Sequence, residues 1–127
     1  PLHATVCALS NASQKTSWPK VERSKSQYHR ISGADKTDSK TLIEQLFCIL
    51  ADRQTAKDEE LPDTGIPLEL EKKLSSIFII SPEYGTRSST VLLVDKNKKV
   101  YWEERTFSNS GDLTNTVVHS FELDISA

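Results

Sequence analysis

The sequence predicts an α+β fold, in which helices and antiparallel sheets with different periodicities occupy different parts of the chain. The first half contains segments with apolar residues at helical spacing, and the second half contains short apolar or alternating segments separated by turn residues. Segregation of this kind indicates α+β rather than a doubly wound α/β fold. With 127 residues, 36% hydrophobic and 27% charged, residues 1–127 are predicted to form a single domain.

One strand and two or three helices are predicted in the first half. Residues 3–9 are β-branched and apolar and predict a buried strand, whereas residues 20–31 fit a helix weakly, with most of its surface in water. A clearer helix runs to about Asp52 and begins with Asp38 as its capping residue; a capping box of Thr41 and Glu44 one turn further in is the alternative start. Pro67 suits the first position of a third, short helix. The apolar face of that helix is predicted to consist of Leu70, Leu74 and Ile77.

Antiparallel strands are predicted in the second half. Residues 77–80 predict a short strand, and residues 90–94 are continuously apolar, as expected for a strand covered on both faces. Residues 95–99 predict a hairpin connection into a strand over 100–107. Residues 116–125 alternate with a period of two, which predicts one buried face. The side chains of that face are Val117, His119, Phe121, Leu123 and Ile125.

Composition and charge argue against several classes of function. A net charge of -2 provides no electrostatic footprint for nucleic acid or for an anionic membrane surface. No apolar stretch is long enough to cross a bilayer, and no signal peptide opens the chain, so a cytoplasmic protein is expected. Cys7 and Cys48 lie in apolar runs and are predicted to be free, packed thiols. Spacings typical of metal sites and glycine-rich phosphate loops are missing, so no metal and no cofactor are expected.

Asn11 is a candidate for catalytic chemistry because it follows the predicted strand over 3–9. An asparagine at the end of a buried strand can aim its amide N–H into a cleft, where it would stabilise a developing oxyanion. The alternative is an Asx turn that only stops the strand. The residues themselves favour the turn.

Arg87 is a candidate for ligand binding because it lies immediately before the most apolar predicted strand. Gly85 permits a tight backbone turn just ahead of it. An arginine in this position is either paired with an internal carboxylate or presented to a carboxylate or phosphate of a ligand. Both interpretations stay open at the level of the sequence.

These segments resemble, in the same order, motifs of the NRDE family, also known as the transport and Golgi organisation family. The matching segments are residues 9–12 with 18–21, 46–47 with 50–53, 61–65, 74–75 with 77–79, 84–90 and 104–107. The Asn-Arg-Asp-Glu tetrapeptide and the cysteine after the initiator Met, which mark the beginning of family members, are absent. The chain therefore resembles the C-terminal portion of a family domain. Its apolar start at Pro1 and its lack of Met lead us to expect a piece of a longer protein.

The resemblance implies an N-terminal-nucleophile hydrolase fold, an αββα sandwich of helices around two antiparallel sheets. In such enzymes an N-terminal Cys, Ser or Thr attacks an amide, and its own α-amino group serves as the base. Pro1 has neither hydroxyl nor thiol, so this chain alone is expected to be inactive. By resemblance to the bile-salt and penicillin V acylases, Asn11 would contribute to an oxyanion hole and Arg87 would line the pocket. Further substrate contacts are expected at Ser10, Trp18, Tyr84 and Thr86.

Three functions stay open for the parent protein. The first is an N-terminal-nucleophile-type hydrolase acting on an amide ligand. The second is a non-catalytic carrier of an apolar ligand such as haem or lipid, and the third is a structural or interaction module. Because strands cut from a larger sheet leave open edges, the expected partner is the missing N-terminal half of the same protein or a second copy.

Overall fold

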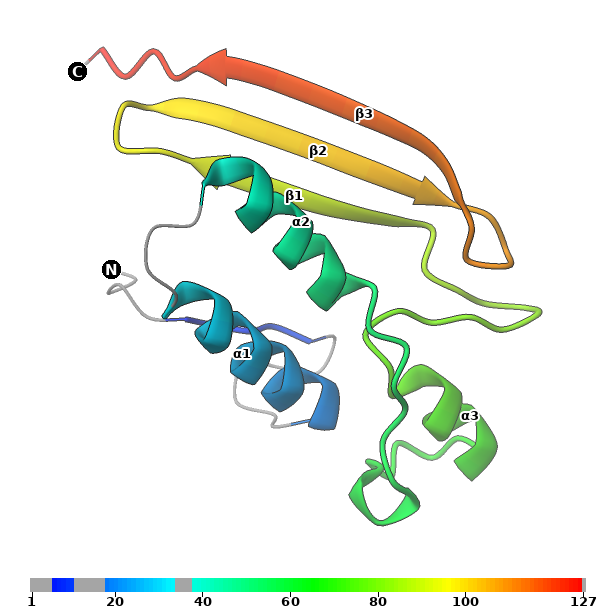
Figure 1. The fold of residues 1–127 in the computed structure, drawn as a ribbon. Coiled ribbons are helices and arrows are strands. Elements are labelled where there is room, and N and C mark those ends of the chain that lie inside the picture. The colour runs from blue at the N-terminus through cyan, green and yellow to red at the C-terminus, as the bar shows by residue number, and fades with distance from the viewer. Residues whose placement is uncertain (1–5, 11–17, 34–37, 127) are drawn as a thin grey trace. The chain divides into compact units, whose positions relative to one another are not determined.

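The computed structural model of the protein describes residues 6–10, 18–33 and 38–126 (Figure 1). The chain forms two compact units, Pro1–Ile79 and Ile80–Ala127, and each is described by itself. The described part of the first unit holds helices, and the second holds antiparallel strands, so the predicted α+β class is confirmed. The helices are α1 (Pro19–Ser32), α2 (Ser39–Leu50), a short 3₁₀ helix (Asp58–Glu60) and α3 (Leu68–Leu74).

Helix α1 begins at Pro19 and ends at Ser32, one residue beyond the predicted range of 20–31 at each end. Trp18 is extended, with φ -73° and ψ 148°, and Pro19 occupies the first helical turn, where its missing N–H removes no hydrogen bond. Gly33 ends the helix and donates its N–H to the carbonyl oxygen of His29 at 3.1 Å. Val21 is the one buried residue of this helix, so most of its surface faces water, as predicted.

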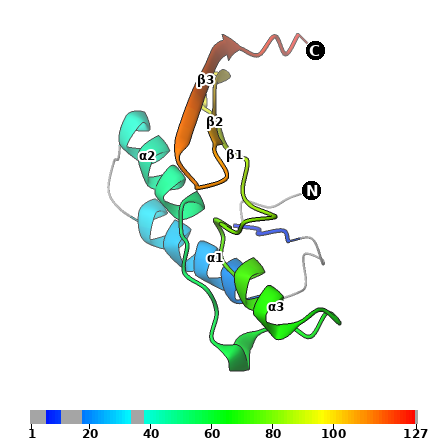
Figure 2. The same cartoon turned by 90° about the vertical axis from the view of Figure 1, so that its right-hand side faces the viewer.

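Helix α2 contacts α1 within the first unit (Figures 1 and 2). Asp38 caps it as predicted, because its Oδ1 accepts the N–H of Thr41 at 2.8 Å. Ile43 and Phe47 lie one turn apart on its buried face. The prediction that Cys48 is packed in the core is wrong, because the residue after Phe47 points about 100° away around the helix and its thiol is exposed.

Helix α3 begins at Leu68, one residue after the proline that was expected to open it. The predicted apolar face is wrong at Leu70, which is 39% exposed, and Glu71 is buried instead. The Oε1 atom of Glu71 accepts the N–H of Thr64 at 2.8 Å. A buried carboxylate is tolerated here because it is hydrogen-bonded.

The predicted buried strand over residues 3–9 is wrong for the part that the structure describes. Residues 6–10 belong to no helix or strand, and Cys7 and Leu9 are exposed. Residues 3–5 lie outside the described ranges. Apolar and β-branched composition favours a strand only where a neighbouring strand and a covering layer exist, and local sequence does not supply either.

The predicted strand over residues 77–80 is also wrong. Ile80 alone forms an isolated bridge, with Gly85. The backbone N–H of Phe78 donates to the carbonyl oxygen of Asp52 at 2.8 Å, so it is satisfied outside any ladder.

The second unit contains one antiparallel sheet with the strand order β1-β2-β3. Its strands are β1 (Ser88–Val94), β2 (Lys99–Phe107) and β3 (Leu113–Glu122). The predicted hairpin at 95–99 joins β1 to β2. Asp95 holds this turn, since its Oδ1 accepts the N–H groups of Asn97 at 2.8 Å and Lys99 at 2.9 Å.

Burial along the sheet differs from the prediction in two strands. Strand β1 alternates between buried and exposed residues along most of its length, so it is covered on one face rather than on both. Strand β3 is exposed at all ten positions, although its alternation predicted a buried face. Leu123 and Ile125, which follow it, are also exposed. Alternation shows that two faces differ in polarity, whereas burial requires another layer to lie on the apolar one.

Candidate functional site

Two connecting segments of the second unit lie beside each other around Arg87, the candidate ligand-binding residue. One is the loop 81–87, which leads into β1, and the other is the turn 108–112, which joins β2 to β3. They line a small pocket of about 20 Å³, which has room for about one water molecule. This pocket is therefore too small to enclose a whole substrate.

Side chain to backbone bonds fold the loop tightly. The Ser81 hydroxyl accepts the N–H of Tyr84 at 3.1 Å and donates to the carbonyl oxygen of the same residue at 2.5 Å. At the end of the loop, the carbonyl oxygen of Arg87 accepts the N–H of Phe107 at 2.8 Å, which extends the β1–β2 ladder. The backbone of Arg87 is thus held by the sheet while its side chain projects from it.

The Arg87 side chain is exposed and its Nη1 donates to Oδ1 of Asn109. Glu83 lines the same pocket, but no ion pair joins Arg87 to a carboxylate among the described residues. Asn109 is neutral, so this contact orients the guanidinium without compensating its charge. Of the two interpretations that the sequence left open, the internal ion pair is not formed among the described residues, and presentation to a ligand stays a prediction.

The turn that carries Asn109 is fixed from within. The Ser108 hydroxyl accepts the N–H groups of Ser110 and Asp112, each at 3.2 Å. The N–H of Ser108 donates to the carbonyl oxygen of Asp112 at 2.9 Å, and Gly111 takes the left-handed conformation, with φ 81°. Glycine suits that position because it lacks the Cβ that disfavours positive φ. Sequence reasoning missed Asn109, although its place in a glycine-containing turn between two predicted strands was a usable signal.

The other predicted site residues divide between the two units. Tyr84, which is 59% exposed, and half-buried Thr86 line the pocket together with Arg87. Ser10 and Trp18 belong to the first unit and are half-buried. Asn11 lies outside the described residues, so its convergence with Arg87 stays a prediction.

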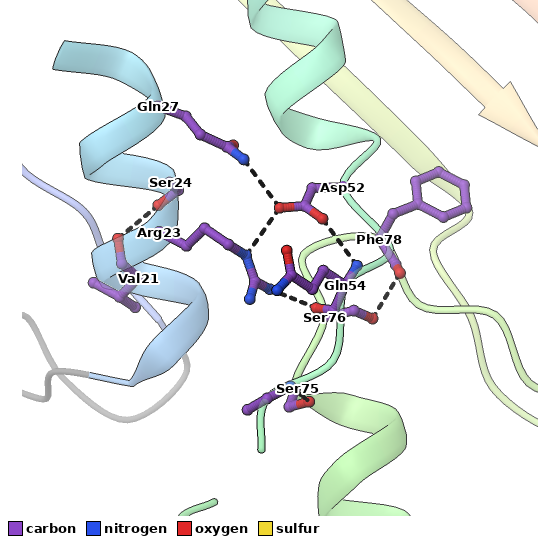
Figure 3. Close-up of polar contacts among 10 residues, drawn as sticks. Val21, Arg23, Ser24, Gln27, Asp52, Gln54, Ser75, Ser76 and Phe78 are labelled. Carbon is purple, nitrogen blue, oxygen red and sulfur yellow. Dashed lines mark hydrogen bonds and ion pairs between the residues drawn. The ribbon is translucent and has the colours of Figure 1, made fainter. Parts of the chain in front are cut away.

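A second polar cluster, in the first unit, surrounds Asp52 (Figure 3). Its Oδ2 accepts from Nε of Arg23 at 2.9 Å and from Nε2 of Gln27 at 3.1 Å, and its Oδ1 accepts the N–H of Gln54 at 2.8 Å. The side chains of the ion pair are 19% and 14% exposed, for Arg23 and Asp52 respectively. Arg23 also donates to the carbonyl oxygen of Gln54. The guanidinium of Arg23 is therefore paired with groups of the first unit.

The pKa of Asp52 reflects this environment. Burial on its own raises the pKa of the carboxyl group, but the hydrogen bonds from Gln54 and Gln27 and the charge of Arg23 outweigh it, and the pKa is lowered. Since the backbone of Asp52 also accepts from Phe78, the cluster connects α1, the end of α2 and the segment after α3. The sequence contained the carboxylate directly after a helix, but no local pattern indicated its partner on α1.

The described residues hold no group of three or more His, Cys, Asp or Glu side chains that could bind a metal ion. In the same part of the chain, no helix is both long enough and apolar enough to span a bilayer.

The sequence model of the transport and Golgi organisation 2 family matches residues 1–109, which include loop 81–87 and Asn109. The chain belongs to the transport and Golgi organisation 2 family. A family relative from Bos taurus, "Transport and Golgi organization protein 2 homolog", is 29% identical over 124 residues. The match covers 91% of this chain and 44% of the relative, so the chain spans less than half of the relative's length. The predicted resemblance to this family is confirmed.

Proposed function

We propose that this chain is the C-terminal portion of a domain with N-terminal-nucleophile-type amide hydrolase activity, and that Arg87 anchors a substrate carboxylate. The single observation that supports the anchor is the exposed guanidinium of Arg87, which is oriented by the neutral amide of Asn109. In this proposal the domain is an αββα sandwich in a cytoplasmic protein. The described sheet would be part of one of its two layers.

The chemistry of the guanidinium fits this role. Arginine presents five N–H donors in a planar fork, and the bond to Asn109 uses Nη1, so other donors are left for an anion. Tyr84, which is 59% exposed on the same loop, would contact the body of the ligand. Asn11 would donate to the oxyanion, and a Cys, Ser or Thr outside this chain would attack the amide. Pro1 lacks the necessary hydroxyl or thiol, so this chain alone is expected to show no hydrolysis.

Titration of the isolated chain with a small amide acid tests the anchor. We expect N-acetylglycine to perturb the Nε–Hε NMR signal of Arg87 saturably, with a dissociation constant on the order of millimolar because the contact is exposed. The matched ligand N-acetylglycinamide lacks the charge and should have no such effect. An equal response to both ligands would contradict the assignment, and so would an unchanged perturbation of the backbone amide signals of loop 81–87 in Arg87→Met.

A family member with an intact N-terminal cysteine tests the reaction itself. Such a protein should form an acyl adduct at that cysteine with an amide or ester probe. The alternative function is a non-catalytic carrier of haem, lipid or another apolar ligand, which is supported by exposed apolar side chains such as Leu92 and Phe121. Tight binding of an apolar ligand without an adduct would favour the carrier and reject the hydrolase.

A further inference from the structure

Glu83 and Arg87 are oppositely charged residues of the same loop, yet they are not paired. Both side chains are exposed, and both line the pocket of about 20 Å³ between loop 81–87 and turn 108–112. None of the ion pairs among the described residues includes either of them. Two charged side chains around a space for about one water molecule can meet by rotation, so their separation needs a physical cause.

The cause is a competing contact with a neutral residue. Nη1 of Arg87 donates to Oδ1 of Asn109. A guanidinium has no acceptor, so the atom of Asn109 in this contact has to be the amide oxygen. An exposed ion pair stabilises a protein only slightly, so one well-placed hydrogen bond is enough to keep Arg87 from Glu83.

Asn109 is held in place by its own surroundings. The N–H of Phe107 donates to the carbonyl oxygen of Arg87 at 2.8 Å, which brings the start of turn 108–112 beside the backbone of Arg87 (Figure 1). The Ser108 hydroxyl accepts the N–H of Ser110 at 3.2 Å and so closes the backbone around Asn109. The sheet and the turn therefore fix the amide oxygen, and the arginine side chain follows it.

The same contact decides which part of the guanidinium is open. A guanidinium can offer paired N–H donors along its Nε–Nη2 edge or along its Nη1–Nη2 edge. Asn109 occupies Nη1, and no other hydrogen bond is made to the Arg87 side chain by the described residues. The Nε–Nη2 edge keeps two parallel donors, which match the two oxygens of a carboxylate.

We propose that Asn109 is a positioning residue that holds the guanidinium of Arg87 away from Glu83 and leaves its Nε–Nη2 edge open to a ligand carboxylate. Glu83 is the internal competitor of that carboxylate: without Asn109, the ion pair of Glu83 with Arg87 forms and occupies the edge. The proposal rests on one part of the proposed function, namely that Arg87 anchors a carboxylate, and it does not depend on hydrolysis.

Titration of variants of this chain with N-acetylglycine, followed by the Nε–Hε NMR signal of Arg87, tests the proposal. Asn109→Ala should raise the dissociation constant about fivefold, because the ion pair with Glu83 then competes with the ligand. Glu83→Gln in the same chain should bring the constant back to within about twofold of the unaltered value, since it removes the competitor. Glu83→Gln alone should not weaken binding.

Two further variants separate positioning from a structural role. Ser110→Ala is the matched control, because Ser110 is an exposed residue of the same turn whose side chain is outside the pocket lining, and it should leave the affinity unchanged. Asn109→Asp keeps an acceptor oxygen but adds a charge, so it should weaken binding, and Glu83→Gln should not restore it. Circular dichroism of each variant verifies that the sheet is folded.

The proposal would be overturned if Asn109→Ala binds N-acetylglycine as well as the unaltered chain does, or if Glu83→Gln fails to reverse the loss. A loss as large in Ser110→Ala would also contradict it, because the turn as a whole would then be responsible. If the unaltered chain does not respond to N-acetylglycine, the Arg87 anchor fails together with this proposal. The acyl-adduct test of the reaction is independent of all these results, so the hydrolase and the role of Asn109 can fail separately.

Discussion

Arg23 and Arg87 are the same kind of residue in two different situations. Arg23 has 19% of its side chain exposed and is bound to the carboxylate of Asp52 and the carbonyl oxygen of Gln54. Arg87 is exposed and is bound to the neutral amide of Asn109. The first guanidinium is neutralised within its own unit, and the second keeps its charge available.

The difference shows how a structural arginine is distinguished from one that is suited to a ligand. A part-buried arginine has to be paired, because an unpaired charge away from water is costly. An exposed arginine does not need a partner for stability, so its guanidinium can stay without a counter-charge, as the proposed anchoring role requires. Substitution by methionine should therefore reduce mainly the stability at Arg23 and mainly the binding of an anion at Arg87.

The largest effect is expected for Arg23→Met. Methionine keeps much of the volume but removes the ion pair with Asp52, and we expect the free energy of unfolding of the first unit to fall by about 2 kcal/mol. Urea unfolding followed by Trp18 fluorescence in a Trp102→Phe background measures this unit alone, because each unit contains one tryptophan. A change below about 0.5 kcal/mol would mean that the cluster around Asp52 does not stabilise the unit.

The free energy of unfolding of the first unit should also depend on pH. The pKa of Asp52 is lower in the folded protein than its ordinary value, so its ionised form stabilises the first unit above about pH 4. This contribution is lost as the pH falls through the folded-state pKa. Asp52→Asn should therefore flatten the acid limb of stability against pH for the transition reported by Trp18. The transition reported by Trp102 should keep its profile, and a change there instead would contradict the assignment.

A smaller loss is expected for Asp38→Ala. The substitution removes the acceptor for the N–H of Thr41 at the start of α2, and the cost should be about a third of that of Arg23→Met. Asp38→Ser keeps a capping oxygen and is the matched control. Equal unfolding midpoints for the two variants would show that the cap makes no contribution.

The smallest effect on stability is expected for Arg87→Met. Since Arg87 is exposed and its hydrogen-bond partner among the described residues is the neutral Asn109, the free energy of unfolding should change by no more than about 0.5 kcal/mol. Binding of N-acetylglycine, measured by NMR, should nevertheless be lost. A destabilisation as large as that of Arg23→Met would remove the distinction between the two arginines.

The helices could be read from the sequence because the signals that begin and end them are local. Pro19 and Gly33 mark the ends of α1, and Asp38 caps α2, each through contacts within a few residues. The hairpin at 95–99 was also local, since Asp95 satisfies the N–H groups of its own turn. In the same way, loop 81–87 could be chosen as a candidate site, because the tight turn and Arg87 are adjacent in the chain.

Long-range contacts could not be predicted in this way. The pairing of Arg23 with Asp52 joins residues 29 positions apart, and the contact of Arg87 with Asn109 joins residues 22 positions apart. No periodicity reports which carboxylate or amide a given guanidinium will meet. The burial of β3 was predicted wrongly for a related reason, because alternation records the polarity of a face and not the presence of a layer upon it.

The sequence by itself therefore determined the α+β class, the starts of α1 and α2, the hairpin and the family of this protein, since these depend on local propensities and ordered motifs. The tertiary structure alone decided which arginine is neutralised by a carboxylate, which amide Arg87 meets, and that β3 is exposed along its whole length. The physical reason is that pairing and burial are properties of two surfaces in contact, whereas a sequence pattern describes only one.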